Sequence, residues 1–96
     1  MSTTPLAVLT ETTFEVSNEK NHRTLRECIA TAMDDYFHHL DGHEPENLYN
    51  MVLREMEEPL LRAVLDYTRS NQSRAAIMLG LNRGTLRKKM KQYNLD

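Results

Sequence analysis

The sequence predicts an all-α fold: a four-helix subunit in a homodimer, with a C-terminal helix-turn-helix and a mobile N-terminal arm. Three observations predict it. Apolar residues recur at three- and four-residue intervals in the middle of the chain, two short helical patterns flank a glycine-containing turn near its end, and the first 23 residues are poor in core-forming side chains. The expected parts are the arm (1–23), two dimerisation helices (24–69) and the helix-turn-helix (70–96).

The arm carries one short alternation of strand type. Thr10, Thr12, Phe14 and Val16 share one strand face, and Ser17-Asn18-Glu19-Lys20 has the composition of a turn. The pattern fits a mobile β-hairpin and disorder about equally well, and a solvated tail is the plainest alternative.

A first helix is expected to begin after Thr24. The run Thr24-Leu25-Arg26-Glu27 has the spacing of a capping box, and Asp41-Gly42 ends the pattern. Between these signals one apolar stripe recurs at helical spacing: Leu25, Ile29, Ala32, Met33, Tyr36, Phe37 and Leu40.

A second helix is expected from Leu48 to Thr68, with Asn47 as its N-cap. A proline inside a helix removes one backbone hydrogen bond, but the apolar pattern continues on both sides of Pro59, so we expect a kink and not a break. At about 100° per residue, the apolar side chains cover more than half of the circumference. The residues of this arc are Leu48, Met51, Val52, Leu53, Met56, Leu60 and Val64, and Leu61 and Leu65 lie on the remaining face.

This wide apolar surface predicts a symmetric dimer. One neighbouring helix cannot cover such an arc, and a chain of 96 residues has few other elements with which to do so. The economical solution is a second copy that packs its own first and second helices into the same core, so we expect an obligate homodimer.

The last 30 residues have the form of a helix-turn-helix. A first short helix is expected from Gln72 to Leu79, with Asn71 as N-cap and Gly80 just past its end. A second is expected from Arg83 to Gln92, with Asn82 as N-cap.

Small and apolar positions inside this region fit the packing of such a motif. Ala76 is small enough for the second helix to cross close to it, and Gly80 suits the turn. Leu86 and Met90, four residues apart, face inward and hold the second helix on the first, and Tyr93 is expected to pack against the motif.

The charge is divided along the chain, although the net charge is only −2. Residues 1–66 hold 5 Lys and Arg against 13 Asp and Glu, a balance of −8, whereas residues 67–96 hold 7 against 1, a balance of +6. A cationic helix beside a tight turn suits the major groove of double-stranded DNA. A solvated basic face is the plain alternative, and the coincidence with a complete helix-turn-helix pattern disfavours it.

Position within the motif divides the candidates between bases and phosphates. Recognition helices enter the groove by their N-terminal residues. The candidates to contact base edges are therefore Asn82, Arg83, Thr85 and Lys88. The planar fork of Arg83 suits guanine O6 and N7 together. Two further groups are placed for phosphates: Arg87, Lys89 and Lys91, and, at the start of the first motif helix, Asn71, Gln72, Ser73 and Arg74.

These residues resemble the Fis (factor for inversion stimulation) family of bacterial nucleoid-associated DNA-binding proteins. The stretches that carry the resemblance are Glu58-Pro59-Leu60-Leu61, Asn71-Gln72-Ser73-Arg74-Ala75-Ala76 and the run from Leu81 to Lys89, and it covers residues 24–96. It implies an intertwined dimer that organises the nucleoid, regulates transcription and bends degenerate sites with AT-rich centres. In that family the recognition helices lie closer together than one DNA turn, so the central minor groove is compressed.

The resemblance also implies roles for individual residues. Base contacts fall on Asn82, Arg83 and Lys88, and backbone contacts on Asn71, Ser73, Arg74, Thr85, Arg87, Lys89 and Lys91. RNA polymerase contacts fall on Arg69, Ser70 and Gln72, with Ser70 in place of a glycine. In the arm, the positions that touch a DNA invertase hold Phe14, Asn18 and Lys20 where the family has an aliphatic, an acid and an aliphatic, which counts against stimulation of site-specific inversion.

Two other interpretations compete with this one. The last 40 or so residues also resemble the DNA-binding tail of NtrC-type activators, but those proteins carry an ATPase domain, and no Gly-x-x-x-x-Gly-Lys-Ser/Thr loop occurs here, so a free-standing protein is favoured. The second competing interpretation is a helical interaction protein that binds no DNA and docks a partner through its acidic helices.

No enzyme, cofactor or metal site is expected. His38, His39 and His43 lie near Asp41 but fit no zinc spacing, so we expect exposed histidines. The single Cys28 cannot form an intrachain disulfide, which favours a reducing cytoplasm and, with a DNA partner, the nucleoid. No membrane partner is expected, because no apolar run approaches the roughly 18 residues of a membrane span.

Overall fold

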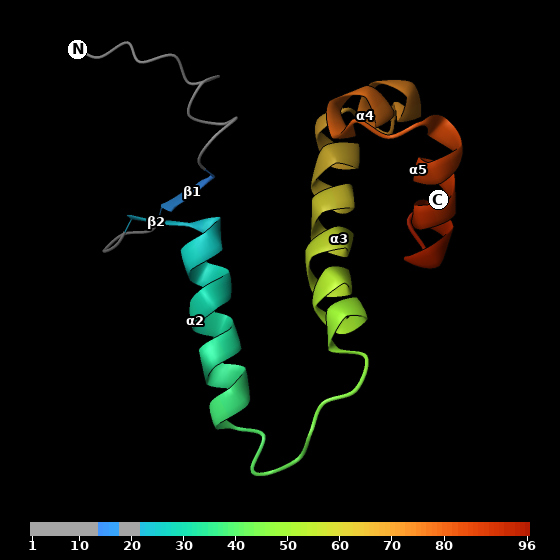
Figure 1. The fold of residues 1–96 in the computed structure, drawn as a ribbon. Helices are drawn as coiled ribbons and strands as arrows, with labels where there is room; N and C mark the ends of the chain where they lie inside the picture. Colours follow the sequence, from blue (N-terminus) through green and yellow to red (C-terminus); the bar gives the residue numbers. More distant parts are fainter. Residues whose placement is uncertain (1–13, 18–21) are drawn as a thin grey trace, which may run out of the picture. The chain divides into compact units, whose positions relative to one another are not determined.

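The computed structural model of the chain describes residues 14–17 and 22–96. This part holds two strands, β1 (Glu15–Ser17) and β2 (His22–Thr24), and four helices, α2 (Leu25–His38), α3 (Leu48–Tyr67), α4 (Gln72–Leu79) and α5 (Arg83–Gln92) (Figure 1). The chain divides into two compact units, Met1–Pro45 and Glu46–Asp96. The expected helical class is confirmed, with a small hairpin before the first helix.

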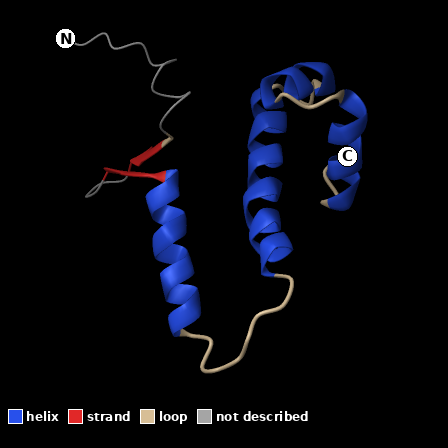
Figure 2. Cartoon of the chain, in the orientation of Figure 1, coloured by secondary structure: helices blue, strands red, loops and turns tan. Residues whose placement is uncertain are grey.

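In the first unit, β1 and β2 pair antiparallel, with Val16 opposite Arg23 (Figure 2). A hydrogen bond also links the hairpin to α2: the Arg23 guanidinium donates to Thr31 Oγ1 at 2.6 Å. The hairpin is confirmed, but the expected turn is wrong at Ser17, which pairs with His22 as part of the strand. The expectations at Thr10, Thr12, Asn18 and Lys20 lie outside the described residues.

The predicted capping box begins α2. The amide of Glu27 donates to Thr24 Oγ1 at 3.0 Å, and the amide of Thr24 donates to Glu27 Oε1 at 2.9 Å. Helix α2 ends at His38, with His39 as its C-cap, before the predicted stop at Asp41-Gly42. Leu40 of the predicted stripe therefore lies outside the helix, and Asp41 and Gly42 follow with positive φ, 56° and 85°. No residue of α2 is buried, and Ile29 and Phe37 on its apolar stripe are 41% and 50% exposed.

Helix α3 continues through Pro59, as expected, and the kink there stays a prediction. Asn47 is the N-cap residue of α3, as expected, but its side chain makes no capping bond. Asn47 adopts a left-handed conformation, with φ at 57°, and its side chain caps no backbone amide but accepts from the side-chain amide of Asn50 at 2.7 Å. The left-handed backbone replaces the extended conformation from which a capping side chain reaches the first turn.

The second unit is built on one hydrophobic cluster. Helix α4 follows the end of α3, and α5 follows α4 after a short turn (Figure 1). The buried members come from all three helices and from the residue after α5: Leu61, Leu65, Ala75, Ala76, Leu86, Met90 and Tyr93. This cluster fixes α5, the expected recognition helix, on α3 and α4. Among the described helices, none is both long and apolar enough to cross a bilayer.

Candidate nucleic-acid interface

Local signals set the bounds of the helix-turn-helix. The side chain of Asn71 accepts from the amide of Arg74 at 3.1 Å and starts α4, and the side chain of Asn82 accepts from the amide of Thr85 at 2.8 Å and starts α5. Gly80 ends α4 with φ at 74°, a conformation that glycine adopts without steric cost. All three predicted caps, and both predicted helices, are confirmed.

Buried side chains hold the two helices together as expected. Ala76 is 4% exposed, and its small side chain lets α5 approach α4 closely. On α5, Leu86 is 0% and Met90 3% exposed, four residues apart on the inner face. Tyr93, just past α5, is also buried. The opposite face of α5 is therefore the one that meets solvent.

That outer face is strongly cationic. Arg83, Arg87 and Lys91 recur at four-residue spacing and are exposed, as is Lys88 beside them. No Asp or Glu occurs between residues 67 and 95. Within residues 14–17 and 22–96, none of these four cations forms an ion pair. Their charge is therefore available to an anionic partner.

The start of α4 adds polar groups of the same kind. Asn71, Ser73 and Arg74 are exposed there, next to the backbone amides of the first turn. Such amides and the helix dipole favour an anion. Gln72 and Thr85 are half-buried, so less of each side chain is accessible. The structure thus places most of the predicted phosphate-contacting residues at the exposed start of α4 and on the exposed face of α5.

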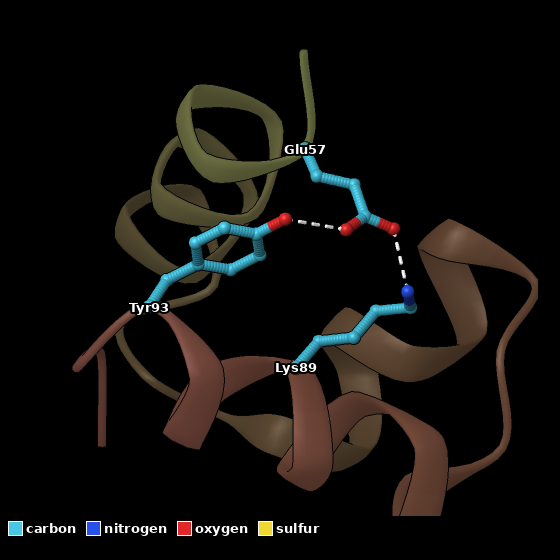
Figure 3. A network of polar contacts seen from close by, with 3 residues as sticks. All are labelled: Glu57, Lys89 and Tyr93. Atoms are coloured by element: carbon cyan, nitrogen blue, oxygen red, sulfur yellow. Dashed lines mark hydrogen bonds and ion pairs between the residues drawn. The ribbon is translucent and has the colours of Figure 1, made fainter. Parts of the chain in front are cut away.

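Lys89 is the exception among the predicted DNA-contacting cations. Its ammonium lies 2.6 Å from Glu57 Oε2, and Tyr93 donates to Glu57 Oε1 at 2.7 Å (Figure 3). The bonds from Lys89 and Tyr93 lower the pKa of the Glu57 carboxyl, and the bond to Glu57 raises the pKa of the Tyr93 phenol. Sequence reasoning missed Glu57. The available signal was the position of Lys89, three residues after Leu86 and four before Tyr93, toward the buried side.

Known protein families match both parts of the chain. The family described as DNA-binding protein Fis N-terminal domain matches residues 1–45, and the family described as bacterial regulatory protein, Fis family, matches residues 52–93. DNA-binding protein Fis from Escherichia coli O1:K1 / APEC is 46% identical over 89 residues, which cover 93% of this chain and 91% of the relative. The chain belongs to the Fis family.

Two further Fis proteins match to the same extent. Those of Klebsiella pneumoniae subsp. pneumoniae and Serratia proteamaculans are each 46% identical over 89 residues, 93% of this chain and 91% of theirs. The likeness to Fis extends over both units and is not confined to a helix-turn-helix, the part that NtrC-type tails resemble.

In this Fis-family chain the turn before α4 has an unusual backbone. Arg69 and Ser70 both have positive φ, 54° and 64°, and the amide of Ser70 donates to the carbonyl of Leu65 at 2.7 Å. Ser70, which stands where the family resemblance has a glycine, thus adopts a left-handed conformation that a glycine would adopt readily.

The remaining candidates lie on the first unit. Phe14 is 63% exposed. His38, His39 and His43 are exposed, as expected, and each Nδ1 lies within 3.1 Å of a backbone carbonyl. In the described ranges no group of three or more His, Cys, Asp or Glu is placed to hold a metal ion. Cys28 is a half-buried free thiol.

Proposed function

We propose that this chain is a dimeric DNA-binding and DNA-bending protein that organises the nucleoid and regulates transcription in the bacterial cytoplasm. One observation carries the proposal: the exposed cationic face of α5, formed by Arg83, Arg87, Lys88 and Lys91, on a helix fixed by buried Leu86 and Met90. A rigid cationic helix after a tight turn has the form that enters the major groove. The names of the Fis relatives, which are DNA-binding proteins, support it.

Each side chain has a proposed role that follows from its place. Asn82 and Arg83, at the N-terminal end of α5, read base edges, because that end of a recognition helix enters the groove. Lys88, exposed in the middle of α5, is the third proposed base contact. Lys89 is set apart from the phosphate-binding group by its bond to Glu57. The others bind phosphates and fix the register: Asn71, Ser73, Arg74, Thr85, Arg87 and Lys91.

Uncovered apolar surface supports the homodimer. On α3, Met51, Met56 and Leu60 are 40%, 40% and 42% exposed. On α2, considered by itself, the apolar stripe has no buried member. Both helices thus leave apolar surface in contact with solvent, and a second copy of the chain covers it in the proposed assembly.

We also propose contacts with two proteins, RNA polymerase and a DNA invertase. Arg69 and Ser70, which are exposed in the turn, and half-buried Gln72 are the proposed contacts with RNA polymerase. Phe14, Asn18 and Lys20 stand at the proposed positions of contact with a DNA invertase, and their side-chain types predict weak or no stimulation of inversion. Both roles come from the family resemblance.

Duplex binding as a function of salt tests the proposal. Fluorescence anisotropy with a labelled duplex gives Kd over a range of KCl concentrations. Arg74, Arg87 and Lys91 supply six cations per dimer, so the slope of log Kd against log salt is expected to reach about 5 in magnitude. Gel mobility of circularly permuted fragments tests bending, and sedimentation tests the dimer. A flat salt response would instead favour a protein that docks partners through its acidic helices.

A further inference from the structure

The carboxylate of Glu57 joins α3 to the recognition helix. Its Oε2 accepts from Lys89 Nζ at 2.6 Å and its Oε1 accepts from the Tyr93 hydroxyl at 2.7 Å, so both oxygens are engaged (Figure 3). The partners lie 32 and 36 residues away along the chain, one helical turn apart at the end of α5. Two successive turns of α5 are thereby tied to a single side chain of α3.

Burial distinguishes this network from an ordinary surface ion pair. The side chains of Lys89 and Glu57 are 27% and 13% exposed, whereas those of Arg62 and Glu58, also paired, are 57% and 45% exposed. Water and salt screen an exposed pair, which then contributes little. Hydrogen bonds to an ion in a partly dehydrated site are shorter and stronger, and their geometry is better defined.

The position of Lys89 on α5 separates it from the other cations. Arg87, Lys88 and Lys91 are exposed, whereas Lys89 lies toward the flank of buried Leu86 and Tyr93. Its charge is already balanced by a carboxylate at hydrogen-bond distance. To bind a phosphate, the Lys89 ammonium would have to move away from Glu57. The partly buried Glu57 carboxylate would then have no cation beside it.

We propose that Glu57, Lys89 and Tyr93 form a clamp that positions α5 for reading base edges, and that Lys89 is a positioning residue in this clamp and not a phosphate contact. The inference rests on the proposed DNA-binding function and specifies one part of it. Because α3 also carries the apolar surface assigned to the dimer, the clamp transmits the geometry of the dimer to the recognition helix.

The first test compares Lys89→Met with Lys91→Met in the full chain. Each variant is titrated by anisotropy against a duplex selected by the wild-type chain from random sequence, and against the same duplex with one base pair changed. Lys91→Met should lower the salt slope by about 0.9 for each phosphate that it no longer binds, and should keep the discrimination between the duplexes. Lys89→Met should keep the slope and lower discrimination roughly fivefold, the low end of one base contact.

The second test exchanges the two charges. Glu57→Lys and Lys89→Glu are made singly and together. If Lys89 acts only through the clamp, the double variant restores the opposite charges and recovers the discrimination that either single variant loses. If Lys89 binds phosphate, the double variant places a carboxylate against DNA and binds as poorly as Lys89→Glu alone, which would overturn the proposal.

A decrease of the salt slope in Lys89→Met equal to that of Lys91→Met would also overturn it. Circular dichroism at the assay temperature confirms that each variant is folded before it is compared. The proposed DNA-binding function is tested first with the wild-type chain. If that chain binds no duplex at low salt, the DNA-binding function fails, whatever the variants show.

Discussion

The side chain of Asn82 accepts a hydrogen bond from the backbone amide of Thr85 at 2.8 Å. Asn82 is the N-cap of the recognition helix α5. It therefore lies at the N-terminal end of α5, the end that we propose enters the groove. Its carbonyl oxygen is engaged in the cap, so the amide nitrogen of the same side chain is the donor left for DNA. The proposed base contact of Asn82 is thus a donation to an acceptor on a base edge.

Substitutions of Asn82 should separate folding from binding. Asn82→Asp keeps the acceptor and adds a negative charge that the helix dipole favours, so stability should hold or rise by about 0.3 to 1 kcal/mol. Duplex binding should fall sharply, because the carboxylate cannot donate and repels phosphates. Asn82→Ala should lose about 1 kcal/mol of stability as well as binding. Urea unfolding at fixed protein concentration and anisotropy measure the two effects, and wild-type affinity in Asn82→Asp would refute the base contact.

Arg83 and Lys91 should differ in what they contribute to binding. Arg83→Ala should cost about 1 to 3 kcal/mol on a selected duplex and relax discrimination at one base pair. Lys91→Ala should weaken binding to all duplexes similarly, because a phosphate contact carries no sequence information. Competition with base-substituted duplexes measures both. Equal losses across all duplexes for the two variants would show that the division of roles is wrong.

The Glu57 clamp predicts how stability depends on pH. The pKa of Glu57 is lowered from its ordinary value of 4.5, chiefly by the bond from Lys89, so the folded state favours the carboxylate. Its contribution is therefore present above the unfolded pKa and is lost as pH falls through the folded pKa. Wild type should exceed Glu57→Gln by about 1 to 2 kcal/mol at pH 7, with the gap closing in acid. Urea unfolding from pH 7 to pH 3 tests this, and a constant gap would contradict it.

The hydroxyl of Tyr93 adds an alkaline pH dependence to the same clamp. The bond to Glu57 raises the pKa of Tyr93 from its ordinary value of 10.0, so the folded state favours the protonated phenol. This contribution is present below the unfolded pKa and is lost as pH rises through the folded pKa. Urea unfolding from pH 7 into the alkaline range should therefore show a smaller loss of stability for Tyr93→Phe than for wild type, and equal losses would contradict this contribution.

Ser70→Gly should stabilise the protein. A left-handed conformation costs a residue with a Cβ roughly 1 to 2 kcal/mol, and the greater freedom of unfolded glycine offsets part of that gain. We expect a net gain of about 0.5 to 1 kcal/mol. Ser70→Ala is the matched control, because it removes the hydroxyl but keeps the Cβ and should bring no gain. Equal stability of the Gly and Ala variants would show that the positive φ of Ser70 carries no cost.

The helix-turn-helix was predictable because its signals are local. Asn71 and Asn82 each stand three residues before the amide that they cap, and Gly80 ends α4 with the positive φ that glycine favours. The inner positions Leu86 and Met90 follow from four-residue spacing alone. Packing and caps agree here, so sequence and structure give the same bounds for α4 and α5.

Other features depend on contacts or backbone conformations that local patterns do not encode. Asn47 has the residue type of an N-cap but adopts a left-handed backbone, so its side chain accepts from Asn50 instead. Lys89 belongs by sequence to a basic run, and only the fold brings Glu57, 32 residues away, to its ammonium. Periodicity indicates which face of a helix a residue occupies, but it does not predict contacts between residues that are far apart in the sequence.

The most direct test of the proposed DNA interface is a ¹⁵N–¹H correlation spectrum of the chain titrated with a selected duplex at several salt concentrations. We predict that the largest shifts fall on the amides of Ser73, Arg74, Arg83, Thr85 and Lys88, and that they diminish as salt is added. Shifts confined to the acidic helix α2, or no shifts at low salt, would contradict the proposed interface.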